Sequence, residues 1–579
     1  MSSTDVLVIS PPVANFGQAT SGISVLVAYL RHKGWTARQW DLAIDAFHHF
    51  HSPAYLGGCA EIILRESRDP SLRDACVRVV AEIEAAKNAL RTPGIELDRD
   101  RMKWAFETIN DAGIVMTAAS RGRYEHDFRH FGVNGAFRSF PHLEASLADS
   151  EQNPYLDYIE TCVIPRLRRE RPRAIGVSLT YFSQIMPGFT LVRLIRRHFP
   201  EMPIVVGGAY LTAVEHDVGR IPTSLLPADA IILHDGEEAL DLWLEAVLNE
   251  EGSPEDIPNC HLADGTFIRG RGQKHTHTDL DSVPVPMWTA DGLELGRYLV
   301  PKYPIPIPLA RGCYWGRCSY CNISCQTSAT YRTRPIPKAL EDLHAAMAET
   351  GSNWFDLPVD SYRPRELHQL ATAIIDSGLE VEWGAEVLLD PAFKDDVIAD
   401  LARSGCRTLR FGLESASVNT LKAMNKPSRP DTARRILEAC KRNGIQTAAM
   451  LIAGFPTESQ AELNLTFDYL CENRDVIDFL TIHQYCLVPG SPMARDPSRF
   501  GIYVLKPEAV LWTSLPFVNT NPIGMRNEDL PRVIASMKDG LRPFYQDLGE
   551  LWTVAIGGWM TFPACCGRRE ELVHPIAGG

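Results

Sequence analysis

The sequence lacks three features that would place it in a membrane, in a secretory pathway or on nucleic acid. It contains no run of about 20 uncharged apolar residues, so no transmembrane helix is expected. Its start, MSSTDVLVISPP, has no charged segment followed by a long apolar one, so no signal peptide is expected. The 72 Asp and Glu outnumber the 58 Lys and Arg, and a net charge of −14 gives no overall attraction to nucleic acid or anionic lipid. We therefore expect a cytoplasmic protein without a nucleic-acid partner.

Internal repeats and low-complexity tracts are also missing. With 45% hydrophobic and 22% charged residues, the composition is that of a globular protein. A chain of 579 residues is too long for one hydrophobic core, so several domains are expected.

Four of the 14 cysteines lie within thirteen positions, in RGCYWGRCSYCNISC. Cys313, Cys318, Cys321 and Cys325 are separated by four, two and three residues. A disulfide is disfavoured because cytosolic thiols stay reduced. Structural zinc is disfavoured because no second ligand pair follows. An iron–sulfur cluster remains, and the plant-type ferredoxin spacing is a rival within that class.

The chain after the cysteines alternates between strand and helix patterns, which is typical of parallel βαβ units. Such sheets carry their chemistry at the carboxyl ends of the strands, where the cysteine loop is expected. We expect a barrel or partial barrel over 305–500. Its strands are predicted within 304–312, 354–360, 380–389, 406–415, 445–456 and 478–490.

The first part of the chain predicts a doubly wound, flavodoxin-like sheet. No G-x-G-x-x-G follows its first strand, so binding of a dinucleotide is disfavoured. The predicted strands lie within 5–12, 37–42, 173–183, 203–212 and 228–234.

These patterns predict how the chain is divided into domains. The first domain spans 1–270 and carries a helical insertion at about 55–170. A linker at 271–304 leads to the barrel, and 501–579 form a small helical C-terminal domain. Within that domain, 507–517 and 528–560 have helical patterns.

Residues 305–500 resemble the radical SAM family, whose members carry three cysteines after the first strand of a partial (β/α)6 barrel and an aromatic residue before the third. Here these are Cys313, Cys318, Tyr320 and Cys321, with four residues instead of three in the first gap. The resemblance implies that the three thiolates hold a [4Fe–4S] cluster whose open iron binds S-adenosylmethionine (SAM). Cys325 is interpreted as a free thiol, because a fourth ligand would close that iron.

Other strand ends match family positions that contact SAM, and Tyr320 is expected near its adenine. No residue is assigned a direct part in bond breaking. The implied SAM contacts are Asp360 and Ser361, Glu414 and Ser415, and Gly454, Phe455 and Pro456.

The first domain resembles cobalamin-binding domains, which pair a Ser-x-Leu strand end with a later Gly-Gly. Ser178-Leu179-Thr180 and Gly207-Gly208 are separated by 26 residues. Glycines would let the backbone approach the cofactor, and the hydroxyls of Ser178 and Thr180 would bond to it. The Asp-x-His-x-x-Gly element that ligates cobalt is absent, and His216 is interpreted as a surface histidine.

Together, the resemblances imply a cobalamin-dependent radical SAM enzyme. Its expected reaction is methyl transfer to an unactivated carbon of a natural product, peptide or lipid, through a 5′-deoxyadenosyl radical and methylcobalamin. A reductant such as flavodoxin or ferredoxin would be its partner. Alternatives are rearrangement, ring contraction or epimerisation on the same scaffold, for which vicinal Cys565 and Cys566 could donate a hydrogen atom. An iron–sulfur electron carrier or a cobalamin sensor are the non-enzyme alternatives.

Overall fold

The computed structural model describes residues 4–95, 98–127, 130–270, 276–289, 293–323, 330–506 and 509–545. Its contacts divide the chain into two compact units. The first unit consists of Met1–Tyr303, Ala345–Gly351 and Glu508–Trp512. The second consists of Pro304–His344, Ser352–Pro507 and Thr513–Gly579.

The first unit is built on a seven-stranded sheet of order β2-β1-β5-β6-β7-β8-β9. Its first five strands are parallel, and their order is that of a flavodoxin-like sheet. Strands β8 and β9 add an antiparallel edge. The predicted sheet is therefore confirmed. Its strands are β1 Val6–Ser10, β2 Ala37–Asp41, β5 Ala174–Ser178, β6 Ile204–Gly207, β7 Ala230–Ile232, β8 Cys260–Ala263 and β9 Ile268–Gly270.

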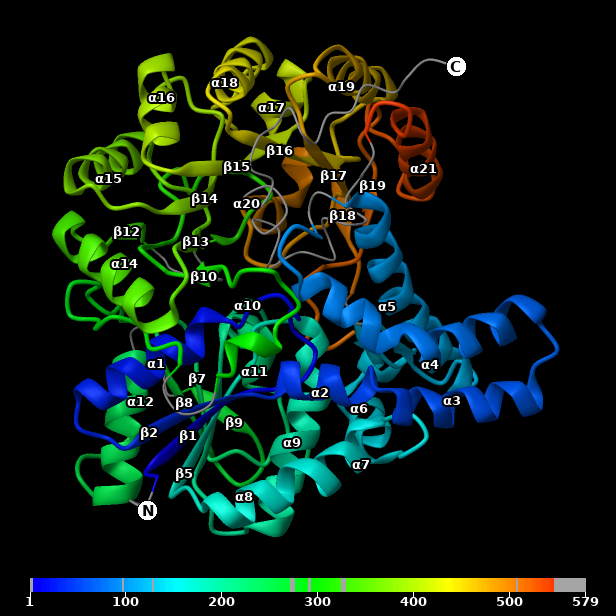
Figure 1. The fold of residues 1–579 in the computed structure, drawn as a ribbon, viewed down its shortest axis with the longest axis vertical. Coiled ribbons are helices and arrows are strands. Elements are labelled where there is room, and N and C mark those ends of the chain that lie inside the picture. The colour runs from blue at the N-terminus through cyan, green and yellow to red at the C-terminus, as the bar shows by residue number, and fades with distance from the viewer. Residues whose placement is uncertain are drawn as a thin grey trace. The chain divides into compact units, whose positions relative to one another are not determined.

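Helices cover both faces of this sheet, with α1 and α12 on one side and α9 on the other (Figure 1). All five residues of β1, VLVIS, are buried, as expected for a central parallel strand. The covering helices are α1 Ser21–His32, α9 Ile185–His198, α10 Ala209–Ala213, α11 Glu215–Val218 and α12 Glu237–Leu244.

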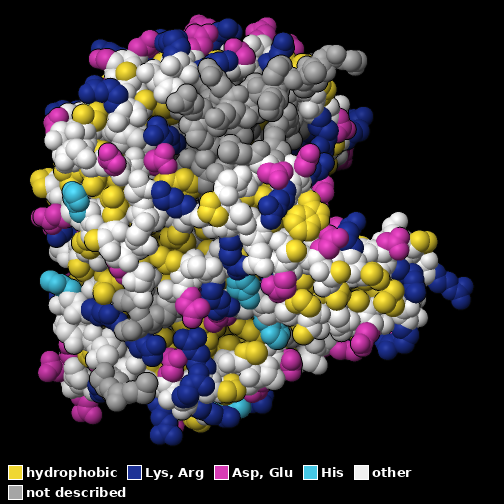
Figure 2. All heavy atoms as spheres, in the orientation of Figure 1, with side chains coloured by type: hydrophobic (Ala, Val, Ile, Leu, Met, Phe, Trp, Pro, Cys, Tyr) yellow, Lys and Arg dark blue, Asp and Glu magenta, His cyan; other side chains and the backbone are white. Residues whose placement is uncertain are grey.

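A largely helical segment connects β2 to β5. It includes one short hairpin, β3 Glu125–His126 with β4 Phe131–Gly132. Hydrophobic side chains gather on the surface of the arm formed by α3, α4 and α5 (Figure 2). The helices of the segment are α2 Leu42–Phe50, α3 Pro53–Glu66, α4 Pro70–Arg91, α5 Arg99–Ala119, α6 Phe140–Ala148, α7 Tyr155–Tyr158 and α8 Ile164–Glu170.

The second unit contains a six-stranded, all-parallel sheet of order β10-β13-β14-β15-β16-β17. Sequential order without reversal is that of a partial (β/α)6 barrel, so this prediction is also confirmed. The strands are β10 Ile305–Pro306, β13 Trp354–Leu357, β14 Glu382–Val387, β15 Cys406–Glu414, β16 Gln446–Ala453 and β17 Phe479–Gln484.

The outer layer of the barrel consists of helices that follow the strands (Figure 1). In α15, Leu367, Leu370 and Ile374 are buried at helical spacing, and Gly378 ends the helix in the left-handed region at φ 68°. The helices are α14 Ile336–Thr350, α15 Pro364–Ser377, α16 Asp395–Arg403, α17 Val418–Ala423, α18 Pro430–Arg442 and α19 Gln460–Glu472.

The described C-terminal residues contain one antiparallel pair and a helix. The pair is β18 Ile502–Val504 with β19 Phe517–Asn519, and the helix is α21 Leu530–Leu541. Short α20, Pro492–Arg495, precedes them. The predicted helix at 507–517 is wrong, because the residues from 509 to 516 are not helical. Cys565 and Cys566 lie outside the described residues.

The mistaken helix has a physical reason. Val510 and Leu511 are buried in the first unit, where the Val510 N–H donates to the Phe137 carbonyl at 2.7 Å. The Leu511 N–H donates to Asp217 Oδ2 at 2.7 Å, and its carbonyl accepts from the Tyr210 hydroxyl at 2.9 Å. The apolar residues that suggested a helix are therefore buried by contacts with segments that lie far away in the sequence. No helix in the described part of the chain has the length and apolar character needed to cross a bilayer.

Candidate functional site

The cysteine loop of the second unit is closed by a short antiparallel pair, β11 Ala310–Arg311 with β12 Arg332–Thr333. Cys313 forms a parallel β-bridge with Ser361, which follows β13. The Tyr314 N–H also donates to the Ser361 carbonyl, at 3.4 Å. The first cysteine is therefore fixed beside the end of the second barrel strand.

Two further contacts fix the middle of the loop. The Ser319 N–H donates to the Met424 carbonyl at 2.9 Å. Asn322 Nδ2 donates to the Pro489 carbonyl at 2.8 Å, in the turn after β17. Since Ser361 follows β13 and Pro489 follows β17, the cysteine loop lies at the carboxyl end of the sheet, as predicted.

The three cysteines are free thiols, and Cys318 is buried. The pKa of Cys321 is raised to about 12, mainly by burial and in smaller part by the negative charges of Cys318, Asp360 and Cys313. Burial also raises the pKa of Cys318. Buried thiols that lie this close together repel one another when they ionise. They become thiolates together only when a cation balances their negative charge. This donor set therefore fits an iron–sulfur cluster.

A single metal ion is a poorer fit. Within the described ranges, no three His, Cys, Asp or Glu side chains are grouped to hold one ion. In a [4Fe–4S] cluster each thiolate binds a different iron, so the sulfurs need not converge on one point.

Tyr320 belongs to a buried network next to the cysteines. Its hydroxyl donates to Glu414 Oε1 at 3.0 Å, and Lys426 Nζ lies 2.8 Å from the same oxygen. A Cβ on Gly412 would lie 2.5 Å from that oxygen and 2.8 Å from Nζ, so the glycine makes room for the pair. Burial alone would lower the pKa of Lys426, but Glu414 and then Cys318 hold it above its usual value. No local sequence pattern pointed to Lys426.

Asp360 and Ser361 lie at the end of β13, as predicted, in different environments. Ser361 is fully buried, and its Oγ accepts from the Leu388 N–H at 3.1 Å. Asp360 is half-buried and raises the pKa of both Cys321 and Glu386. The carboxylate of Asp360 is thus the member of this pair that a ligand near the cysteines could reach.

Ser415 and Gly454 are joined by a carboxyl group that sequence analysis did not assign. Glu458 Oε2 accepts from the Gly454 N–H at 2.8 Å, and its Oε1 accepts from Ser415 Oγ at 3.4 Å. Burial raises the pKa of Glu458 to about 7 against these hydrogen bonds. Ser415 Oγ also lies 3.1 Å from Thr466 Oγ1. In the sequence, Glu458 is marked only by its position four residues after Gly454.

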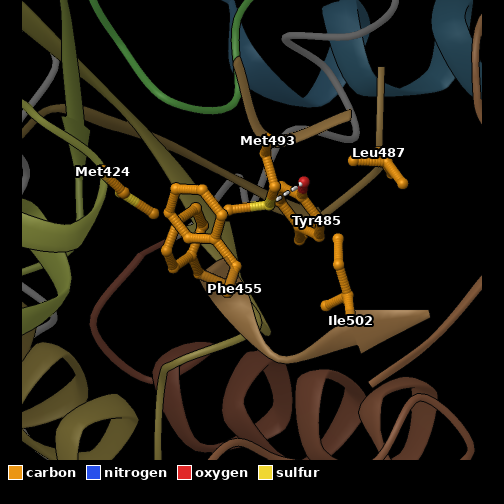
Figure 3. Close-up of a cluster of buried hydrophobic side chains, with 7 residues drawn as sticks. Met424, Phe455, Tyr485, Leu487, Met493 and Ile502 are labelled. Atoms are coloured by element: carbon orange, nitrogen blue, oxygen red, sulfur yellow. Dashed lines mark hydrogen bonds between the residues drawn. The ribbon is translucent and has the colours of Figure 1, made fainter. Parts of the chain in front are cut away.

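Phe455 and Pro456 contribute to packing next to the same strand end. Phe455 is fully buried and forms an edge contact with Tyr485 at 5.4 Å between ring centroids (Figure 3). The Pro456 carbonyl accepts from Asn519 Nδ2 at 2.9 Å. Tyr320 packs against the buried cluster that contains Phe455. The expected contact of Tyr320 with the adenine of SAM stays a prediction. The buried cluster consists of Met424, Phe455, Tyr485, Leu487, Met493, Phe500 and Ile502.

Another charged group connects three barrel strands. Arg410 on β15 is 2% exposed, and its Nη2 lies 2.8 Å from Asp356 Oδ1 on β13. Its Nε lies 3.7 Å from Glu386 Oε1 on β14. Burial raises the pKa of Glu386 to about 7, although Arg410 opposes the rise. Strand patterns alone did not reveal this interaction.

In the first unit, the predicted cobalamin residues meet at the carboxyl ends of β5 and β6. Ser178 pairs with Gly207 in the sheet, and the Leu179 N–H donates to the Gly207 carbonyl at 2.8 Å. The hydroxyls of Ser178 and Thr180 have no hydrogen-bond partner among the described residues. Two free hydroxyls at this edge fit a ligand with hydrogen-bonding groups.

The two glycines have a structural reason of their own. A Cβ on Gly208 would lie 2.2 Å from the Leu179 carbonyl oxygen, and its φ is 107°. A Cβ on Gly207 would lie 2.8 Å from the Ile232 carbonyl oxygen. Packing between strand ends therefore requires both glycines, whether or not a cofactor approaches them.

Gly208→Ala is therefore expected to destabilise the cofactor-free protein by about 2–4 kcal/mol, through a backbone clash and an unfavourable φ. Urea unfolding measures the change. The matched control is Gly219→Ala, because Gly219 has φ −66° and open space at its Cβ position. The control should change stability by less than about 0.5 kcal/mol. Equal stability of both variants would contradict the packing role.

Gln184 connects the loops after β1 and β5, and sequence analysis missed it. Its Oε1 accepts from the Thr180 N–H at 2.7 Å, and its Nε2 donates to the Pro11 carbonyl at 2.8 Å. These strands are adjacent, and the chain leaves them in opposite directions along the sheet. Ligands bind at such a switch point in doubly wound sheets.

The interpretations of His216 and Cys325 have different outcomes. The side chain of His216 is 42% exposed, which agrees with its interpretation as a surface histidine. Cys325 lies outside the described residues, so its role stays a prediction.

Residues 307–470 match the sequence model of the radical SAM superfamily. This segment is a radical SAM domain. It begins directly after the first barrel strand, β10, and contains all three cysteines and the charged networks around Glu414 and Arg410.

Two curated relatives carry methyltransferase names. The uncharacterized methyltransferase PH0819 of Pyrococcus horikoshii is 22% identical over 306 residues, 52% of this chain and 65% of the relative. The bacteriochlorophyllide d C-12(1)-methyltransferase of Chlorobaculum tepidum is 28% identical over 197 residues, 33% of this chain and 42% of the relative. The chain thus spans less than two thirds of the length of either relative.

The similarity of the fold to solved structures extends beyond the radical SAM segment. The fold is similar to the structure of TsrM, a radical S-adenosylmethionine methyltransferase from Kitasatospora setae solved with cobalamin and a [4Fe–4S] cluster bound. The TM-score is 0.54 at 14% identity, over 88% of this chain and 82% of that chain. The likeness includes both the flavodoxin-like sheet and the barrel, so it supports the predicted fold class.

Proposed function

We propose that this protein is a cobalamin-dependent radical SAM methyltransferase that acts on an unactivated carbon of a natural-product, peptide or lipid substrate. One observation carries the proposal. A single chain contains a flavodoxin-like sheet, with parallel strands in the order β2-β1-β5-β6-β7, and a radical SAM barrel with three free thiols at the carboxyl end of its strands. The names of the curated relatives support methyl transfer over rearrangement, ring contraction or epimerisation.

The residues fit the proposed cofactors. When bound, the cluster and SAM would supply a 5′-deoxyadenosyl radical, and cobalamin would carry the methyl group. Cys313, Cys318 and Cys321 would hold the cluster with three thiolates, which leaves one iron for SAM. A reductant such as flavodoxin or ferredoxin would deliver the electron.

The carboxylates of the barrel favour a cationic ligand such as SAM. Asp356 is paired with Arg410, and Glu414 with Lys426. Asp360 is half-buried, and its charge acts directly on Cys321. We propose that Asp360 receives the ammonium group of SAM, and that the network around Glu414 orients its ribose. Ser361, Ser415 and Gly454 would shape the site through the backbone that they hold in place.

Cobalamin would bind at the carboxyl edge of the first sheet. The free hydroxyls of Ser178 and Thr180 would hydrogen-bond to it, while Gly207 and Gly208 keep the strand ends close. Gln184 would fix the two loops that border the site.

The test is reductive cleavage of SAM. Protein reconstituted anaerobically with iron, sulfide and hydroxocobalamin should release 5′-deoxyadenosine when SAM and a strong reductant are added. A protein that only carries electrons or senses cobalamin would release none. Absence of 5′-deoxyadenosine from protein with an intact cluster would contradict the radical step. Methyl transfer is tested separately, by following the methyl group of SAM.

A further inference from the structure

The loop between β1 and α1, residues 11–20, contains three buried polar atoms without a hydrogen-bond partner. They are Asn15 Nδ2, Gln18 Nε2 and Thr20 Oγ1. Buried polar groups in folded proteins are nearly always paired, so three orphans within six residues point to a missing partner.

Local structure does not use these groups. Asn15 Oδ1 accepts from the Gly17 N–H at 2.7 Å, which fixes the orientation of the amide and leaves Nδ2 free. Thr20 precedes α1 as its N-cap, yet its side chain makes no capping hydrogen bond. Gln18 is 4% exposed, and its amide makes no hydrogen bond to any described residue.

The loop also lies at the proposed cofactor edge. Pro11, its first residue, accepts the hydrogen bond from Gln184 that connects it to the end of β5. A Cβ on Gly22, just past the loop, would lie 3.9 Å from Ser178 Oγ. Val13 has φ 68°, which is strained for a β-branched residue, and such strain persists mainly at functional sites.

The chemistry of the unpaired atoms indicates their ligand. Two are amide N–H donors, and the third is a hydroxyl. They therefore suit a ligand rich in carbonyl oxygens, and the corrin ring of cobalamin carries carboxamide side chains around its edge. Ser178 and Thr180 add two free hydroxyls of the same kind.

We propose that Asn15, Gln18 and Thr20 bind the peripheral carboxamides of the corrin ring. The inference rests on the proposed function, since it assigns a binding loop to the cobalamin of that proposal. It predicts that the loop contributes to cofactor binding at the expense of the stability of the cofactor-free protein.

The test compares Gln18→Leu with Gln39→Leu. Gln39 is a buried amide whose bonds are satisfied, from Ser24 Oγ at 3.1 Å and to the Met287 carbonyl at 2.8 Å. Removing an orphan should not weaken the fold, whereas removing a paired amide leaves its partners unsatisfied. Gln18→Leu should therefore melt at or above the wild-type temperature, and Gln39→Leu below it.

Binding is measured by titration with hydroxocobalamin and with cobinamide, which lacks the nucleotide tail but keeps the carboxamides. Gln18→Leu should raise the Kd for both by about tenfold, the loss expected for a buried hydrogen bond. Thr20→Val, which removes only a hydroxyl, should act in the same direction if Gln18→Leu folds poorly. Folded Gln39→Leu should bind both ligands like the wild type.

Three results would overturn the proposal. An unchanged Kd in Gln18→Leu and Thr20→Val, with tight wild-type binding, would contradict the loop assignment and leave the proposed function intact. A loss confined to hydroxocobalamin would assign the loop to the nucleotide tail. Absence of binding by the wild type would contradict the proposed function together with this inference.

Discussion

Replacing Cys318 with alanine is expected to abolish the iron–sulfur absorbance of the reconstituted protein and all cleavage of SAM. Cys318 is buried among the other two thiols and Lys426, so an alanine there leaves a cluster with two protein ligands. Cys313→Ala and Cys321→Ala should behave in the same way. The measurement is iron and sulfide content together with the visible absorption spectrum.

Two cysteine variants serve as controls for this loss. Cys486→Ala removes an exposed thiol at the end of β17 and should retain the cluster. Cys325→Ala should retain both the cluster and SAM cleavage, because the account leaves one iron open. Loss of the cluster in Cys325→Ala alone would mean that four cysteines bind it and that no iron is open.

Arg410→Met is expected to destabilise the protein by about 3–5 kcal/mol, since it leaves the carboxylate of Asp356 buried without its cation. Arg410 lies 2.8 Å from that carboxylate, and both side chains are largely shielded from water. Urea unfolding of the apoprotein measures the effect.

Arg434→Met is the matched control for Arg410→Met. Its partner Glu438 is 2.9 Å away, but the two side chains are 50% and 39% exposed. Exposed pairs contribute roughly 0–1 kcal/mol. Similar losses in the two variants would show that burial does not determine the importance of the Arg410 pair.

The strands of both sheets were predictable because their signals are local. Buried apolar runs mark the central strands, and glycines such as Gly378 end the helices in a conformation that other residues avoid. The cysteine spacing likewise needed no tertiary information. The order of elements was therefore enough to predict the two folds. The expected domain boundaries, 1–270, 305–500 and 501–579, stay predictions.

The features that sequence reasoning missed depend on contacts between distant segments. Lys426 pairs with Glu414, which lies at a register shift between β15 and β16 that no local pattern predicts. The segment 507–517 looked helical because of apolar residues such as Val510 and Leu511. Their backbone N–H groups instead donate to Phe137 and to Asp217, the latter 294 positions earlier in the chain. No local pattern distinguishes such contacts from helix packing.

The central claim is that one chain binds both SAM and cobalamin and passes a methyl group between them. The most direct measurement uses the reduced, cobalamin-loaded protein and SAM with a trideuterated methyl group. Mass spectrometry of the extracted cofactor should detect a trideuteromethyl group on cobalamin, together with S-adenosylhomocysteine. Bound cobalamin that stays unmethylated while the cluster remains intact and SAM is present would contradict the account.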